Sequence, residues 1–243
     1  SNFYIQSKYV DISDYINSSH WCAFTLLHFT EKESSTDDII NYMLISLALG
    51  VIYFTLYSFF GWIYEILFHA VIHRKLHFQG FLALPLLPIY GFGAVSILTI
   101  TYPYANNPIM VFISAVLVAT VLELITSTFL LKVFNVRLWD YTNWPLNYKG
   151  KVGVISSLGF GVLGLLLLYV FQPIMNHLVS FIPAAYIGVT ASFLFVIILL
   201  DFIYSTRSLS TLNLHSSAAK SSVYLSAQEI HKRNMKRIKA IFN

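Results

Sequence analysis

The feature that most constrains this chain is a succession of long apolar runs separated by short polar stretches. A helix needs about 20 residues to cross the ~30 Å hydrocarbon core of a bilayer, and several runs reach that length. The composition agrees, because only 11% of the 243 residues are charged, whereas about a quarter are charged in a typical soluble protein. We therefore expect an all-α integral membrane protein.

About five transmembrane helices are expected. Their bounds are residues 42–72, 87–103, 108–134, 152–172 and 184–206. The fourth is expected to kink or end at Gln172–Pro173, because proline cannot donate a backbone hydrogen bond within a helix. The chain then divides into an extracytoplasmic or interfacial segment, a transmembrane domain, and a cytoplasmic linker with a basic amphipathic helix, at residues 1–40, 41–207 and 208–243.

Basic residues indicate the orientation of these spans, because cytoplasmic loops carry an excess of Lys and Arg. They gather after the first span, around the loop after the third, and in the tail: Arg74, Lys75, Lys132, Arg137, Lys149, Lys151, Arg207, Lys220, Lys232, Arg233, Lys236, Arg237 and Lys239. Five spans put all three segments on one side, which predicts an outside amino terminus and a cytoplasmic carboxyl terminus. Residues 227–242 of the tail fit a helix on the inner leaflet or a dock for a cytoplasmic partner.

The segment that follows the first span is apolar but rich in helix breakers. Residues 80–93 contain Gly80, Pro85, Pro88, Gly91 and Gly93. Non-helical backbone at membrane depth is tolerated only where protein or a water-filled cavity satisfies its polar groups. We therefore expect a re-entrant or broken segment here, with a pocket beside it.

Three carboxylates fall inside expected spans: Glu65, Glu123 and Asp201. An ionisable side chain at membrane depth is costly and usually faces the interior of the bundle. Glu65 and Glu123 lie on spans of the same direction, so they reach similar depths. Two interpretations remain open, a ligand site or ion pairs with the cations of the neighbouring loops. For Asp201, which is close to Arg207, a structural ion pair is favoured.

The loop after the third span and the start of the fourth carry two further patterns. The loop interleaves aromatic with charged and amide side chains, which fits an interfacial aromatic belt or a site that binds a polar headgroup; they are Arg137, Trp139, Asp140, Tyr141, Trp144, Asn147, Tyr148 and Lys151. The fourth span opens with small residues at helical spacing, which predict a helix-packing seam; they are Gly153, Ser157, Gly161 and Gly164.

One alternative is a metal site at Glu65, His69, His73 and His77, which recur every four residues. Side chains from one straight helix cannot all close on one ion, so a stripe of histidines at the interface is the favoured interpretation. The single cysteine, Cys22, excludes an internal disulfide and suggests no Cys/His metal site. We expect no metal, no other cofactor and no nucleic-acid partner.

Four motifs together resemble a known family. They are YSFFGWIYE at residues 57–65, GFLALPLLPIYGFG at 80–93, LELITS at 122–127 and VRLWDYTNWPLNYKGKV at 136–152. In this order they resemble the family called Putative ABC-transporter type IV, or CmpB-like, which includes small multi-span proteins of Gram-positive bacteria. The chain departs from the family pattern at Gln79, Leu131 and Lys151, where Arg, an acidic residue and Arg are common.

The resemblance implies a multi-pass protein of the bacterial cell membrane. We expect a membrane-embedded component of a transport system, a permease-like subunit that binds a small solute or lipid headgroup in a cavity on the cytoplasmic side. The expected ligand-binding residues are Trp62, Glu65, Pro88, Tyr90, Glu123, Arg137, Trp139, Asp140 and Asn147. The 243 residues contain no GxxxxGK[ST] motif, so a partner ATPase or an ion gradient would supply the energy. Membrane lipids, another membrane subunit and a second copy of the chain are the other expected partners.

Two alternatives remain open. The first is a membrane enzyme that acts on a lipid or lipid-linked substrate at the inner leaflet, with Glu65 or Glu123 as general acid or base. A clear nucleophile is missing for that chemistry. The second is an accessory or sensor protein that binds another membrane protein through the fourth span and the basic tail.

Overall fold

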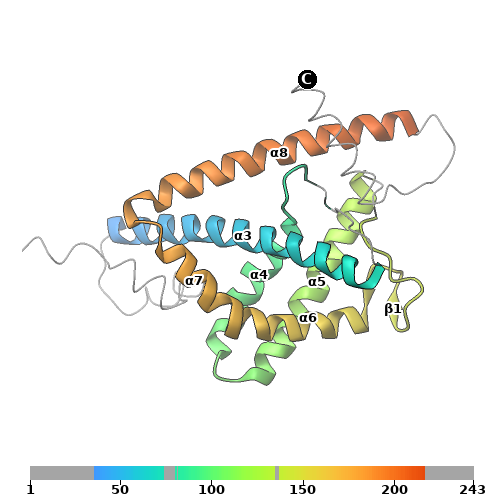
Figure 1. The fold of residues 1–243 in the computed structure, drawn as a ribbon, viewed down its shortest axis with the longest axis horizontal. Helices are drawn as coiled ribbons and strands as arrows, with labels where there is room; N and C mark the ends of the chain where they lie inside the picture. Colours follow the sequence, from blue (N-terminus) through green and yellow to red (C-terminus); the bar gives the residue numbers. More distant parts are fainter. Residues whose placement is uncertain (1–35, 74–79, 81, 135–136, 217–243) are drawn as a thin grey trace, which may run out of the picture.

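The computed structural model describes residues 36–73, 80, 82–134 and 137–216, which are mostly helical (Figure 1). The long helices are α3 (Thr36–His73), α5 (Pro108–Phe134) and α8 (Ile187–Ser216). Shorter elements connect them: α4 (Pro88–Thr101), η2 (Tyr102–Tyr104), β1 (Asn147–Tyr148), β2 (Val152–Gly153), α6 (Val154–Leu166), η3 (Leu167–Phe171), α7 (Gln172–Ser180) and η4 (Ala184–Tyr186). The predicted amino-terminal segment and basic tail lie outside the described residues, as do Arg74 and Lys75.

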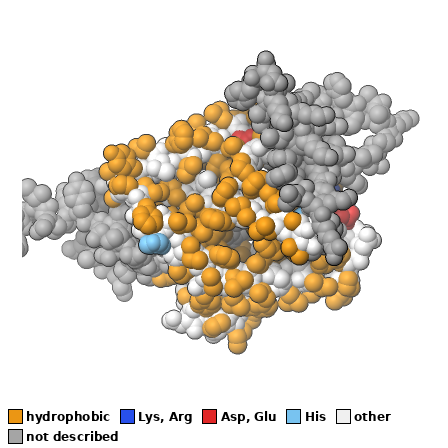
Figure 2. Space-filling view, viewed as in Figure 1, with side chains coloured by type: hydrophobic (Ala, Val, Ile, Leu, Met, Phe, Trp, Pro, Cys, Tyr) orange, Lys and Arg blue, Asp and Glu red, His pale blue; other side chains and the backbone are white. Residues whose placement is uncertain are grey.

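Four of the described helical stretches are long and apolar enough to cross a bilayer: Met43–Val71, Pro108–Val133, Val154–Ser180 and Ala184–Arg207. Large apolar side chains on them stay exposed, for example Leu47, Leu117 and Phe193, which are more than half exposed. Hydrophobic side chains cover most of the described surface in the view of Figure 2. A monomeric soluble protein rarely exposes apolar surface on this scale. The chain is therefore a multi-pass membrane protein.

The stretch expected at residues 87–103 is helical, as α4 followed by η2, but it is not among the described helices long enough to cross a bilayer. α4 has 14 helical residues, which correspond to about 21 Å of rise, short of the ~30 Å hydrocarbon core. Its start is set by Pro88, which lies at the first helical positions and pushes the residue before it into extended backbone. At the other end the chain tightens into η2, which contains Pro103, and Asn107 then accepts hydrogen bonds from the first amides of α5.

The segment before α4 is not helical, and its backbone is satisfied by protein groups. Residues 82–87 are not helical, yet Leu82 is fully buried. The amides of Ala83 and Leu84 donate to the two carboxylate oxygens of Asp201 on α8, at 3.2 and 3.0 Å. The amide of Leu87 donates to the carbonyl of Ser58 on α3, at 3.0 Å. Asp201 therefore holds the broken segment against the bundle. The sequence pattern favoured an ion pair for Asp201 and did not predict this contact.

The fourth span is longer than the expected 152–172, because the helix continues past Pro173 to Ser180. It does so through η3, one turn of wider π-helix just before the proline. Such a bulge lets the helix continue although proline cannot donate a backbone hydrogen bond. Figure 1 shows the bend between α6 and α7. At the bend, Gln172 and Asn176 accept hydrogen bonds from Tyr57 and Tyr53 of α3. The bend thus gives two buried amides their partners.

The elements alternate in direction along the bundle. α3 and α8 contact each other and run the same way in Figure 1, whereas α6 and α7 return in the opposite direction. The carboxyl ends of α3, α5 and α8 lie at the same end of the molecule. The three basic segments of the sequence follow these three helix ends. The orientation of the chain across the membrane stays a prediction.

α5 and α6 pack through the predicted seam of small residues. A Cβ placed on Gly161 would lie 2.6 Å from side-chain carbons of Phe112 and Val116, and one on Gly164 would lie 2.3 Å from the Cβ of Ala115. The hydroxyl of Thr120 donates to that of Ser157 across the same seam, at 2.9 Å. The predicted packing role is confirmed for Ser157, Gly161 and Gly164, whereas Gly153 lies in β2 beside Tyr141.

Replacing Gly161 with leucine is expected to destabilise the bundle by about 2–3 kcal/mol, because the new side chain overlaps Phe112 and Val116. The matched control is Gly159→Leu on the same helix, where a Cβ meets no atom within 4 Å. Thermal unfolding in detergent, followed by circular dichroism, measures both. Equal melting temperatures for the two variants would contradict the close approach of α5 and α6.

Candidate functional site

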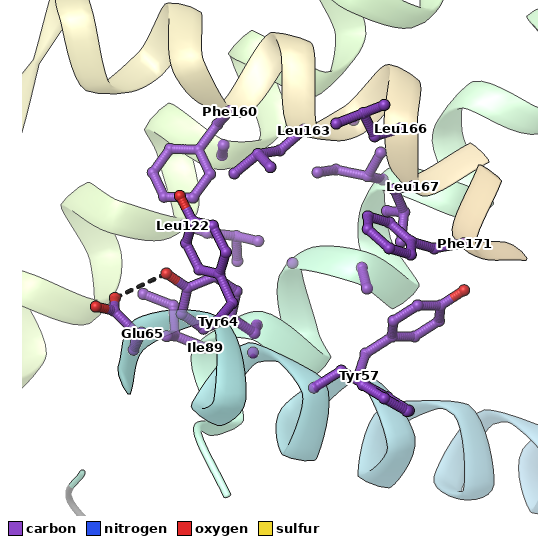
Figure 3. Close-up of a pocket in the computed structure, with 18 of the residues that line it drawn as sticks. Tyr57, Tyr64, Glu65, Ile89, Leu122, Phe160, Leu163, Leu166, Leu167 and Phe171 are labelled. Atoms are coloured by element: carbon purple, nitrogen blue, oxygen red, sulfur yellow. Dashed lines mark hydrogen bonds between the residues drawn. The ribbon is translucent and has the colours of Figure 1, made fainter. Parts of the chain in front are cut away.

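A cavity of about 630 Å³ lies inside the bundle, between α3, α4, α5 and the helical stretch from α6 to α7. Figure 3 shows Tyr57, Tyr64 and Glu65 on one side of it, with Phe160 and Leu163 on the opposite side. Most of its lining side chains are apolar, and eight are aromatic. Ligand pockets commonly have ~300–1,000 Å³ and a few polar groups on an apolar lining. The cavity fits that description.

The first polar group of the cavity is Glu65. Its Oε1 accepts a hydrogen bond from the hydroxyl of Tyr90 on α4 at 2.7 Å, drawn as a dashed line in Figure 3. Its Oε2 lies 3.4 Å from Nε2 of His69, one helical turn further along α3. The Glu65 side chain is 26% exposed. Glu65 is thus a partly accessible carboxylate whose two oxygens already have partners.

The second polar group is Glu123 of α5, which is 4% exposed. Its Oε1 accepts hydrogen bonds from the hydroxyls of Tyr141 at 2.9 Å and Ser156 at 3.3 Å. Its Oε2 is buried and has no hydrogen-bond partner within the described part of the chain. A buried carboxylate oxygen without a partner is costly. Glu123 is therefore the least satisfied acidic group of the cavity.

Tyr141 reaches Glu123 because the loop between α5 and α6 folds back over the end of the cavity. β1 and β2 form a short antiparallel hairpin closed at Lys149 and Gly150, which both have positive φ. At the closure the amide of Lys151 donates to the carbonyl of Tyr148, at 3.0 Å. This hairpin departs from an all-helical fold, and glycine adopts its φ of +68° without strain.

Polar contacts within the loop hold its shape. Arg137 Nη1 lies 2.7 Å from Asp140 Oδ2, and Trp139 Nε1 donates to the carbonyl of Lys151 at 2.9 Å. Asn147 donates to the carbonyl of Trp144 at 2.8 Å. Burial raises the pKa of Asp140, but hydrogen bonds from Thr142 and Arg137 outweigh it and leave that pKa below its ordinary value. Asp140 is therefore a charged structural group of the loop.

Tyr141 itself has a pKa well above its ordinary value, chiefly because of its burial and further because of the nearby Glu123 carboxylate. Its hydroxyl consequently keeps its proton and acts as a hydrogen-bond donor to Glu123.

Four of the nine expected ligand-binding residues line this cavity: Glu65, Tyr90, Glu123 and Trp139. The other five, Trp62, Pro88, Arg137, Asp140 and Asn147, are not among its lining residues. Pro88 begins α4, and the last three stabilise the loop. A ligand-binding role for any of the nine stays a prediction.

Tyr64, Tyr141 and Phe160 line the cavity but were not among the expected residues. Tyr64 and Tyr141 lie in the sequence motifs at residues 57–65 and 136–152, so their place near the site could have been predicted. Phe160 had none, because the apolar side chains of α6 look alike on every face of the helix. Among the described residues, no group of three or more His, Cys, Asp or Glu is placed to hold a metal ion. His77 and the side chain of His73 lie outside that description.

The sequence and the structure were compared with protein families, curated proteins and solved structures. Searches of the curated proteins and of the solved structures found no match. The model of the family described as Putative ABC-transporter type IV matches residues 52–206. That range includes the second half of α3, which carries Glu65, and continues through α4, α5, the hairpin loop and α6 to most of α8. It covers more than half of the 243 residues, so the chain belongs to the Putative ABC-transporter type IV family.

Proposed function

We propose that this protein is the membrane-embedded, permease-like component of a bacterial transport system and binds its ligand in the cavity beside Glu65 and Glu123. The observation that carries the proposal is that cavity, a space of about 630 Å³ lined mainly by apolar side chains with two carboxylates on its wall. A carboxylate inside a membrane bundle commonly marks a substrate or ion pathway. The family name is compatible with this role.

The broken segment before α4 supports the same proposal. Transporters often build their binding sites from discontinuous helices whose unwound backbone is satisfied within the protein. Residues 82–87 followed by the short α4 have this form, and α4 contributes Tyr90 and Gly93 to the cavity. We propose that 82–101 is a re-entrant or broken membrane segment and that the loop of residues 137–153 faces the cytoplasm of a bacterial cell.

The proposed transport needs a source of energy, which another subunit would supply. The 243 residues contain no nucleotide-binding GxxxxGK[ST] motif. An ATPase subunit, or a second membrane subunit that uses an ion gradient, would therefore complete the system. The apolar surface of α5 and α8 is available to lipids, to such a subunit or to a second copy of the chain.

The proposal is tested by purifying the full chain in a mild detergent and identifying what comes with it by native mass spectrometry. We expect a subunit with a nucleotide-binding motif or a further membrane subunit, together with a small molecule bound to the chain. Ala119→Phe fills the cavity wall and should remove the small molecule. Val121→Phe on the same helix is the control, because Val121 is 53% exposed and does not line the cavity.

Circular dichroism shows whether both variants fold. A folded monomer with no partner and no bound molecule would contradict the proposal. A changed lipid composition of cells that carry Glu123→Gln, with no partner found, would favour a lipid-modifying enzyme instead.

A further inference from the structure

The cavity combines negative charge with aromatic rings. The ionisable side chains on its wall are two glutamates and four tyrosines, with one tryptophan beside them. No Lys, Arg or His is among its lining residues. The described cations nearby are held elsewhere: Arg137 by Asp140, and Lys151 by the hydroxyl of Thr128 at 3.0 Å. The interior therefore offers acceptors and π-faces, with no described cation to receive an anion.

Glu123 is the carboxylate of the cavity that has too few interaction partners among the described residues. It is 4% exposed, and within the described residues no Lys, Arg or His lies within 4 Å of its carboxylate. Its Oε2 also lacks a hydrogen-bond donor there. A carboxylate at membrane depth normally finds a partner of opposite charge or a set of donors. A cation that enters the cavity would supply what the described residues do not.

The aromatic rings of the cavity also favour a cationic ligand. Tyr57, Tyr64, Phe160 and Phe171 stand around the cavity in Figure 3, and Trp139 and Tyr141 line it from the loop. The faces of such rings attract cations, most strongly where water is excluded. The remaining wall is aliphatic, which favours a ligand with a large apolar body.

We infer that the ligand of this cavity is an apolar cation, such as a hydrophobic ammonium, seated with its positive charge between Glu123 and the aromatic rings and its apolar body against α6. This inference rests on the proposed function, since it names the class of ligand for the same cavity. The cation can be a free solute or the headgroup of a chain-bearing lipid, because both present the same chemistry to the wall. An anionic phosphate headgroup is excluded as the preferred ligand.

The test uses two probes of the same shape and opposite charge, tetraphenylphosphonium and tetraphenylborate. Their binding to the full chain in a neutral maltoside detergent is measured by equilibrium dialysis, with protein-free micelles as background. We expect the cation to bind at least about tenfold more tightly than the anion, from the carboxylate and the rings together. Dodecyltrimethylammonium, which carries a lipid-like chain, should displace the bound cation. If dodecyltrimethylammonium binds more tightly than tetraphenylphosphonium, the natural ligand is a lipid headgroup. If it binds more weakly, the natural ligand is a free solute.

Glu123→Gln keeps an acceptor for Tyr141 but removes the charge, and should weaken binding of the cation about tenfold without weakening that of the anion. Glu65→Gln should weaken it less, because Glu65 already has partners in Tyr90 and His69. The control is Asp37→Asn, which removes one negative charge near the start of α3, about 40 Å from Glu65 along the helix. It should leave binding within about twofold of the original.

Equal binding of both ions, with both lost in Ala119→Phe, would overturn the charge preference and leave the cavity as a ligand site. Binding of neither ion would overturn the inference, while the search for a partner and a bound molecule would still decide the proposed function. Folded Glu123→Gln and Glu65→Gln proteins that bind the cation as tightly as the original would also overturn it.

Discussion

Replacing Gly91 with alanine is expected to destabilise the protein by about 3 kcal/mol or more, although alanine is the better helix former. α4 crosses α3 at this glycine. A Cβ added there would lie 2.3 Å from Oγ of Ser58 and 2.7 Å from the backbone carbonyl oxygen of Phe54. A side chain can rotate away from such an overlap, but the backbone of a long helix cannot. α4 would have to move off α3, and the hydrogen bond from Tyr90 to Glu65 would be lost with it.

Gly93→Ala is the matched control for this substitution. Gly93 lies on the same helix, and a Cβ added to it meets nothing within 4 Å. It should leave stability unchanged or raise it by up to about 1 kcal/mol through helix propensity. Thermal unfolding in detergent, followed by circular dichroism, compares the two. Similar melting temperatures would show that α3 and α4 are not in this close contact.

Removing the carboxylate of Asp201 is expected to have the second large effect. In Asp201→Ala, the amides of Ala83 and Leu84 lose their acceptors. An unsatisfied buried amide costs about 1–3 kcal/mol, so these two partly buried amides should together cost no more than about 6 kcal/mol. The broken segment should then detach locally from α8. Hydrogen exchange measured by mass spectrometry should rise in residues 82–87, and the melting temperature should fall.

Two further variants separate this contact from nearby packing. Asp201→Asn keeps one carbonyl acceptor and should lie between the original protein and Asp201→Ala. Ser205→Ala removes a hydroxyl that lies 3.4 Å from Asp201 Oδ1, a weak contact whose loss should cost less than about 1 kcal/mol. Unchanged exchange at residues 82–87 in Asp201→Ala would contradict the proposed anchoring.

Much of the architecture was predictable because it follows from length, polarity and helix breakers. Apolar runs of about 20 residues predict spanning helices, and the described part of the chain contains four such stretches. Pro88 begins α4, and the break before it lies where glycines and prolines gather. The length of the fourth span was not predictable in this way. Pro173 indicated an end, but a π-helical turn and the contacts of Gln172 and Asn176 with α3 allow the helix to continue.

The candidate site was predictable in part for a similar reason. Carboxylates inside apolar runs are conspicuous, so Glu65 and Glu123 were expected to face the interior, and both line the cavity. Their partners were not deducible from local pattern. Tyr141 lies 18 residues beyond Glu123, and the loop that carries it is held by a hydrogen bond from the Tyr141 amide to the carbonyl of Gly150 in the hairpin turn.

From the order of its residues alone, this chain is a multi-pass membrane protein with acidic groups inside its apolar runs and most of its basic residues in three segments between and after them. The folded structure adds which groups meet: Tyr90 with Glu65, Tyr141 with Glu123, and Asp201 with amides 117 and 118 residues away. The physical reason is that a helix in lipid is apolar on the faces toward lipid and toward protein alike. Its sequence therefore carries little information about which face packs inward, and close contacts at Gly91 and Gly161 settle that choice.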